Sequence, residues 1–134
     1  MINAVDHIGI AVLDLEASMG LYKTIFGITE FHRETVESQG VDIASFSLNG
    51  VRIELTAPLN EMSPIATFIA KRGEGIHHIA FHTDAIHEDL QRLASHDIRL
   101  INTEPQAGAH NMLISFLHPK STGGVLMELC SEKQ

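Results

Sequence analysis

The chain has 134 residues, a size that favours one compact domain or two small fused half-domains. Nine lysines and arginines against 17 aspartates and glutamates give a formal net charge of −8, which argues against a general nucleic-acid binder because such proteins need a basic face. With 44% hydrophobic and 19% charged residues, the composition is that of an ordinary soluble protein. The single cysteine, Cys130, excludes an internal disulfide framework and a cysteine-based zinc site, and its apolar neighbours indicate a small core residue.

Nothing in the chain predicts export or insertion into a membrane. The first six residues lack the basic start of a signal peptide, and no apolar run approaches the length of a membrane-spanning helix. We therefore expect a cytoplasmic protein with no membrane partner. Nine histidines are many for this length and, beside one cysteine, they make a histidine–carboxylate metal site worth testing.

The first half of the chain predicts a strand, a helix and three further strands. Residues 5–12 alternate around His7, as a half-buried strand does. Apolar residues recurring every three or four positions predict a helix over residues 15–26, with Asp14 as its N-cap and Gly27 as the residue that ends it. The strands expected to follow lie at residues 28–37, 41–48 and 51–56, with turns at Gln39-Gly40 and Asn49-Gly50.

The second half repeats this succession after a short linker. Ser63, followed by proline, predicts the start of a linker helix at about residues 63–73. A strand at residues 76–83 comes next, and then a helix whose N-cap is expected to be Asp84. The remaining strands are expected at residues 98–101, 112–117 and 125–130, with loops at residues 105–111 and 118–124.

The two halves align at an offset of 71 positions, which places His7 on His78. The apolar residues of the two helices match at the same offset, since Leu15, Met19 and Tyr22 fall on Ile86, Leu90 and Leu93. Two copies are too few for a solenoid, so we interpret them as a pseudo-symmetric pair. The prediction is a single α+β domain, residues 1–134, in which two fused β-α-β-β-β modules (about 4–57 and about 75–131) form a curved, mixed-sheet cup.

Each module ends in a strand with an internal glutamate, Glu54 in the first and Glu128 in the second. Together with His7 and His78 they offer four ligands that can converge on the pseudo-twofold axis. Two imidazoles and two carboxylates suit a divalent ion such as Zn, Co, Ni, Mn or Fe. Glu128 has apolar neighbours on its own strand face, and a buried carboxylate needs a partner. Glu54 shares its face with Arg52, so a surface glutamate would give the same pattern.

The other histidines are interpreted from strand alternation. His77 faces away from His78 and is expected to be structural, whereas His82 lies on the same face as His78, one step further along. The remaining four are interpreted as surface residues: His32, His87, His96 and His110.

Two segments are particularly distinctive, Gly-Glu-Gly-Ile-His-His at residues 73–78 and His-Pro-Lys-Ser-Thr-Gly-Gly at residues 118–124. Further matching segments lie at residues 6–12, 22–27, 32–34, 39–41, 53–55, 57–59 and 125–129. In these segments the chain resembles, almost from end to end, the methylmalonyl-CoA epimerase family of the vicinal oxygen chelate (glyoxalase/bleomycin-resistance) superfamily.

This resemblance implies paired β-α-β-β-β modules around one divalent metal ion, with Co, Zn, Ni and Mn as candidates. The family's ligands would fall on His7, His78 and Glu128, and Glu54 stands where some members have glutamine. The implied reaction interconverts (2R)- and (2S)-methylmalonyl-CoA, an isomerisation that feeds a cobalamin-dependent mutase in propionate metabolism. The implied partner is thus a small acyl-CoA substrate, and by analogy the resemblance also allows a homodimer.

The implied chemistry needs two acid–base groups, because a proton leaves one face of the substrate C2 and returns to the other. Glu128 is the expected catalytic carboxylate. Some epimerases carry a glutamate proposed as a base on the strand after the Gln-Gly pair, and this chain has none there. The second base therefore stays open among Asp42, Glu37 and His82.

An anionic substrate conflicts with the net charge of −8, and the loop at residues 118–124 offers a local answer. Lysine and backbone N–H groups can receive an anion, either the substrate carboxylate or a CoA phosphate. We therefore expect Lys120 and Ser121 to bind substrate. The alternative is a plain hairpin loop with an exposed lysine.

Three other functions share parts of this pattern. A glyoxalase I-like lactoylglutathione lyase would use the same metal and fold on a glutathione hemithioacetal. An Fe(II) extradiol dioxygenase would use two histidines and one carboxylate and would need open coordination positions for O2. A drug-sequestering binding protein would need no metal ligands. Metal content and proton exchange into the substrate discriminate between these hypotheses.

Overall fold

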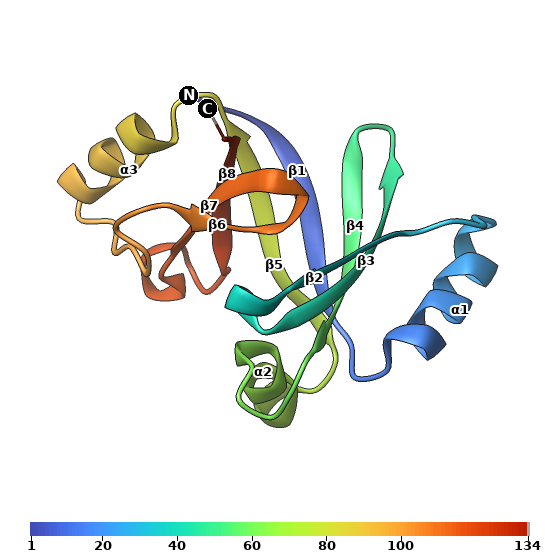
Figure 1. The fold of residues 1–134 in the computed structure, drawn as a ribbon. Coiled ribbons are helices and arrows are strands. Elements are labelled where there is room, and N and C mark those ends of the chain that lie inside the picture. Colours follow the sequence, from blue (N-terminus) through green and yellow to red (C-terminus); the bar gives the residue numbers. More distant parts are fainter. Residues whose placement is uncertain (134) are drawn as a thin grey trace. The chain divides into compact units, whose positions relative to one another are not determined.

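The computed structural model describes residues 1–133. The elements follow one another as β1-α1-β2-β3-β4, then α2, then β5-α3-β6-β7-β8 (Figure 1). This is the predicted succession of two β-α-β-β-β modules joined by a linker helix. By their internal packing the residues form two compact units, one of Ile8–His77 and one of Met1–His7 with the chain from His78 onward.

Eight strands and three α-helices make up the regular structure of the described residues. The strands are β1 Ile2–Ala11, β2 His32–Val36, β3 Val41–Leu48, β4 Val51–Pro58, β5 Gly75–Thr83, β6 Gln106–Ala107, β7 Met112–Leu117 and β8 Met127–Glu132. The helices are α1 Leu15–Phe26, α2 Pro64–Arg72 and α3 Ile86–Ser95, with short 3-10 turns at η1 Glu37–Gln39, η2 Ala109–Asn111 and η3 Pro119–Ser121.

The unit Ile8–His77 holds an antiparallel ladder in the order β2-β3-β4, with β1 next to β4. The backbone N–H of Val12 donates to the carbonyl oxygen of Thr56 at 3.0 Å, beyond the end of β1. Leu15 of α1 packs with Val12 and with inward-facing residues of β3 and β4, among them Leu55. Burial of this apolar cluster is what holds the helix on the sheet.

The other unit is a mixed sheet, in which β5 pairs with β8 in parallel and β8 pairs with β7 in antiparallel fashion. The core of this unit contains two clusters of apolar residues. In the first cluster, Ile86 and Leu90 of α3 pack against Leu117 and Leu129. The other joins residues of β5, β7 and β8, namely Ala80, Met112, Ile114 and Cys130, with Phe116 packed against it. Cys130 is thus a core residue, as predicted.

Three of the four predicted helix boundaries are confirmed by cap geometry. The Asp14 side chain accepts the N–H of Ala17, and Gly27 ends α1 in the left-handed region at φ 65°. Ser63 caps α2 by accepting the N–H of Ile65. Glycine suits the position after α1 because a Cβ atom disfavours positive φ.

The prediction that Asp84 caps α3 is wrong. The N-cap position is Ala85, which has no side-chain oxygen to offer, and the N–H of Ala85 instead donates to Thr83 Oγ1 at 3.0 Å. Asp84 forms an ion pair with the amino group of Met1 at 2.6 Å. The hydroxyl of Thr83 therefore satisfies the backbone next to this helix start.

Two predicted strands begin or end elsewhere. The strand expected at residues 28–37 is shorter, because β2 starts at His32. Phe31, just before it, packs its ring edge-on against Phe46 with centroids 5.6 Å apart and belongs to the α1 cluster rather than to a ladder. The last strand spans Met127–Glu132 instead of residues 125–130, since Glu132 pairs with Met112 and lengthens the ladder at its far end.

The prediction of a strand at residues 98–101 is wrong. In the structure this segment forms an isolated antiparallel β-bridge, between Leu100 and Leu117. Ile98 and Leu100 pack against the α3 cluster, so their alternation reflects burial of a loop rather than strand pairing. The strand β6 lies instead at Gln106–Ala107, inside the segment predicted as a loop.

None of the helices formed by residues 1–133 has the length and apolar character needed to cross a membrane.

Candidate metal centre

The structure brings His7, His78 and Glu128 together from β1, β5 and β8. His7 Nε2 lies 3.1 Å from His78 Nε2 and 3.6 Å from Glu128 Oε2. His78 Nε2 lies 3.3 Å from Glu128 Oε1. The two imidazole rings meet edge-to-face, with centroids 5.2 Å apart and an interplanar angle of 89°. Three of the four predicted metal ligands therefore point at one small volume.

The strand register explains how these side chains meet. Glu128 of β8 lies opposite Ala80 of β5 on one side and opposite Phe116 of β7 on the other. Phe116 also contacts the His78 ring edge-on, at a centroid distance of 5.5 Å. All three polar residues are buried, with 5% of His7, 8% of His78 and 4% of Glu128 exposed. A carboxylate in such surroundings is stable only with charged or hydrogen-bonding partners.

The donor set fits a divalent ion. One ligand atom from each of His7, His78 and Glu128 lies within 4.8 Å of the other two. Two neutral imidazole nitrogens and one carboxylate oxygen are the ligands that borderline divalent ions prefer. The two Nε2 atoms lie at hydrogen-bond distance, 3.1 Å apart, and a bound cation would replace this direct contact between the rings. These three residues are therefore a candidate metal centre.

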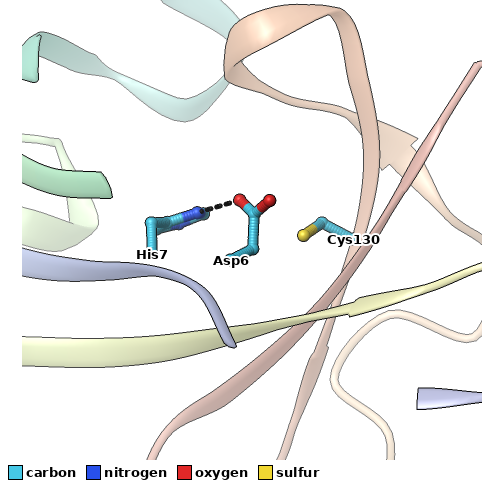
Figure 2. Close-up of side chains that lie close together, drawn as sticks. All are labelled: Asp6, His7 and Cys130. Atoms are coloured by element: carbon cyan, nitrogen blue, oxygen red, sulfur yellow. Dashed lines mark hydrogen bonds and ion pairs between the residues drawn. The ribbon is translucent and has the colours of Figure 1, made fainter. Parts of the chain in front are cut away.

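Asp6 is a polar residue of this centre that the sequence interpretation missed. Its carboxylate oxygen Oδ2 accepts a hydrogen bond from His7 Nδ1 at 2.7 Å (Figure 2). Figure 2 shows the carboxylate turned toward the His7 ring, with Cys130 on its other side. Strand alternation predicts opposite faces for neighbouring residues, so spacing alone gave no signal. The signal available was an acid directly before a proposed histidine ligand.

Glu54, the fourth predicted ligand, lies in β4 within the unit Ile8–His77. It is buried, with 3% exposed, and its carboxylate forms an ion pair with Arg52 at 3.2 Å. A buried carboxylate with a cationic partner has a structural explanation of its own. Its role as a metal ligand stays a prediction.

The candidates for a second base lie in different environments. His82 Nδ1 is 2.8 Å from Asn3 Oδ1, and His82 Nε2 is 2.8 Å from a carboxylate oxygen of Glu132. Asp42 accepts hydrogen bonds from Arg33 and Thr35 on the neighbouring strand β2. Glu37 is exposed at the start of η1. Both ring nitrogens of His82 are occupied, which weakens its case as a base.

The predicted substrate loop is built around His118 and Pro119. The backbone N–H of Lys120 donates to His118 Nδ1 at 3.1 Å, and the N–H of Ser121 donates to the His118 carbonyl at 2.9 Å. The Ser121 hydroxyl accepts the N–H of Arg99 at 2.9 Å. The N–H groups of Lys120 and Ser121 are used inside the loop, whereas the ammonium of Lys120 belongs to an exposed residue and can reach an anion.

The remaining histidines largely follow their interpretation. His77 packs edge-on against Phe68, with centroids 4.9 Å apart, and burial lowers its pKa to about 4. It is therefore a neutral, structural residue at neutral pH. His32, His87 and His96 are exposed, whereas His110 is half-buried rather than a plain surface residue.

Comparisons with known proteins agree with this fold. The family model described as the Glyoxalase/Bleomycin resistance protein/Dioxygenase superfamily matches residues 6–116. An uncharacterised protein of Bacillus subtilis, YqjC, is 42% identical over 131 residues, covering 98% of this chain and 94% of that protein. The mitochondrial methylmalonyl-CoA epimerase of Dictyostelium discoideum is 39% identical over 129 residues, covering 96% of this chain and 78% of that protein.

A solved structure of a methylmalonyl-CoA epimerase in complex with methylmalonyl-CoA and NH4+ is 37% identical, covers 98% of this chain and 96% of that chain, and has a TM-score of 0.94. The fold class is thereby confirmed as that of the glyoxalase/bleomycin resistance protein/dioxygenase superfamily. Within it, the chain belongs to the methylmalonyl-CoA epimerase family.

Proposed function

We propose that this protein is a metal-dependent isomerase that interconverts (2R)- and (2S)-methylmalonyl-CoA. The observation that carries the proposal is the convergence of His7, His78 and Glu128 in one buried cluster. The epimerase relatives add the substrate, since one of them binds methylmalonyl-CoA. Their names favour an epimerase over the glyoxalase I-like alternative.

The metal would be held by His7, His78 and Glu128, with Glu54 as the predicted fourth ligand. Neutral imidazoles bring no charge, so the negative charge that offsets the divalent ion would come from the carboxylates. A divalent ion bound there supplies positive charge against the enolate that forms when C2 loses its proton. Co, Zn, Ni and Mn all suit this donor set.

Side chains of the protein would remove the C2 proton of the substrate and return it. The C2 hydrogen lies between a thioester and a carboxylate, so its removal breaks the C–H bond and leaves the electron pair delocalised into the thioester as an enolate. Glu128 is the proposed group that takes or returns this proton through one carboxylate oxygen. Inversion requires a second group on the opposite face, and Asp42 and Glu37 stay the leading candidates.

Charge on the substrate is matched locally. Lys120 is proposed to pair with the substrate carboxylate or with a CoA phosphate, as a mobile ammonium point charge. Ser121 is proposed to assist through its hydroxyl proton, since its oxygen already accepts from Arg99. A cytoplasmic location, a homodimer and the treatment of residues 1–134 as one domain stay predictions.

The decisive experiment follows hydrogen exchange at C2. Protein loaded with Co2+ is incubated with (2R)-methylmalonyl-CoA in D2O, and epimerisation and deuterium uptake are read by NMR or mass spectrometry. We expect deuterium at C2 to appear together with the (2S) isomer. The same preparation is then assayed with methylglyoxal and glutathione. Turnover of the hemithioacetal without deuterium uptake into methylmalonyl-CoA would replace the proposed function by the glyoxalase I-like alternative.

A further inference from the structure

We propose that Asp6 is a positioning residue that holds His7 in the tautomer and orientation needed for metal binding. The inference rests on the proposed function, because it concerns the same metal centre. Asp6 need not touch the ion or the substrate to act in this way. It would act through His7 alone.

The first argument is geometric. Asp6 Oδ2 lies 2.7 Å from His7 Nδ1, the length of a charge-assisted hydrogen bond. An ionised carboxylate only accepts hydrogen bonds, so the proton of the neutral His7 ring must lie on Nδ1. The lone pair of Nε2 then points toward His78 and Glu128, 3.1 and 3.6 Å away. The side of the ring that would bind the ion is therefore chosen by the acid on its other side.

The second argument is burial. The side chains of Asp6 and His7 are only 12% and 7% exposed, so water competes little for this hydrogen bond. On its other side the carboxylate faces Cys130, whose thiol lies in the same small cluster (Figure 2). Cys130 is 1% exposed. A buried hydrogen bond to a charged acceptor is stronger and more directional than one in water.

The third argument is the effect that such a contact has on a metal ligand. A carboxylate bonded to the distal nitrogen of a ligating histidine fixes the ring orientation and raises the basicity of the ligating nitrogen. Loss of such a contact typically weakens metal binding by about 10- to 100-fold.

The experiment compares Asp6→Asn and Asp6→Ala with wild-type protein. Metal-stripped protein labelled with 15N-histidine is examined by long-range 1H–15N correlation, which reports the tautomer of each ring. The affinity for Co2+ is then measured by titration, with the visible absorption of bound Co2+ as the signal. His7→Ala serves as the reference for loss of the ligand itself.

The chain offers a matched control in Glu132→Gln. Glu132 is also a carboxylate bonded to a histidine, His82, at 2.8 Å, but that histidine is not in the metal cluster. The same charge is removed from the same kind of pair. A general effect of net charge on Co2+ binding would appear in this control as well.

We expect wild-type His7 to carry its proton on Nδ1 and Asp6→Ala to shift the ring toward the Nε2–H form, whereas Asp6→Asn removes the charge but keeps an amide oxygen that can accept from Nδ1. We expect Co2+ to bind both variants at least about tenfold more weakly, while Glu132→Gln stays within about twofold of wild type. If Asp6→Ala does not fold, the Co2+ affinity of Asp6→Asn, which keeps the side-chain volume, decides alone.

Two results would overturn the inference in distinguishable ways. If His7→Ala loses Co2+ but both Asp6 variants bind it within about twofold of wild type with the His7 tautomer unchanged, the metal centre stands and the role of Asp6 is wrong. If His7→Ala binds Co2+ as wild type does, the proposed metal centre itself is wrong and the role of Asp6 falls with it.

Discussion

Phe116 lies directly opposite Glu128 in the antiparallel register of β7 and β8. Side chains in such a pair share one face of the sheet and lie close together. The Phe116 ring also meets His78 edge-on, so an apolar surface borders both the carboxylate and one imidazole. The candidate metal centre is therefore a small set of polar side chains bordered by apolar core residues. Substitutions of these side chains are expected to affect metal binding, whereas substitutions of exposed residues elsewhere are not.

Loss of either central histidine should abolish metal binding. We expect His7→Ala and His78→Ala to bind Co2+ at least about 100-fold more weakly than wild type, because each change removes an imidazole ligand rather than a supporting contact. Metal content after dialysis and Co2+ titration measure this. His87→Ala is the matched control, since His87 is exposed on α3 and should retain full metal content. Full metal content in both central variants would contradict the proposed site.

Removal of the Lys120 ammonium should weaken substrate binding. We expect Lys120→Ala to raise KM for methylmalonyl-CoA by about 3- to 10-fold with little change in kcat, because the charge pairs with the anion in ground state and transition state alike. Lys120→Arg should recover most of the loss. Lys71→Ala removes an exposed lysine of α2 as a control for net charge. An unchanged KM in Lys120→Ala would remove this residue from the substrate site.

His77 should make stability depend on pH. Burial lowers its pKa in the folded chain from an ordinary 6.5 to about 4, so the unfolded chain binds a proton first as pH falls. The full stability is therefore present above pH 6.5 and is lost as pH falls from 6.5 toward 4, with a cost of about 2 kcal/mol at pH 5.

Urea unfolding of wild type and His77→Phe at pH 7.5 and pH 5 measures this effect. Phenylalanine keeps an edge-on ring against Phe68 and has nothing to titrate. The variant should lose less free energy of unfolding than wild type over this pH range. Equal losses in the two proteins would show that His77 is protonated in the folded state as easily as in the unfolded state.

Gly108 should tolerate no side chain. A Cβ atom at this position would lie 2.7 Å from Cγ2 of Ile114, a buried and β-branched side chain that cannot swing away. We expect Gly108→Ala to reduce the free energy of unfolding by about 1–3 kcal/mol through overpacking. Gly20→Ala is the opposite control, because Gly20 lies in α1 with nothing within 4 Å of its Cβ position. That change should stabilise the protein by about 0.5–1 kcal/mol.

The double variant Gly108→Ala with Ile114→Ala completes this test. Removing the Ile114 side chain relieves the overlap, so the two changes should cost less together than the sum of their separate costs. Strict additivity would show that Gly108 is needed for a reason other than contact with Ile114.

Local rules predicted the elements where one residue determines the backbone. Asp14 and Ser63 were recognised because their side-chain oxygens accept backbone N–H groups at a helix start, and Gly27 because it readily adopts the left-handed conformation that ends a helix. The segment at residues 98–101 was misjudged because Ile98 and Leu100 are buried by α3, and burial produces the same alternation in a loop as in a strand. Pairing partners across the sheet decide such cases, and they are not encoded within the segment.

The site was predictable to the extent that it repeats. His7 and His78 were found because the halves align, and Glu128 because its strand neighbours are apolar. Asp6 was missed because its contact with His7 joins adjacent residues that a regular strand sends to opposite faces. Backbone N–H groups of the loop around Lys120 were expected to receive an anion, yet those of Lys120 and Ser121 donate to His118, which spacing alone does not reveal.

The contact between His7 and His78 also sits at the two places where the chain passes from one compact unit to the other. The unit Ile8–His77 begins directly after the first histidine and ends directly before the second. In polymer terms, a tie between residues 71 positions apart closes a loop that contains that whole unit. A metal ion held by both histidines binds the folded chain and not the unfolded one, so it stabilises the folded state by mass action. Occupation of the metal centre should therefore resist separation of the two ends of that unit.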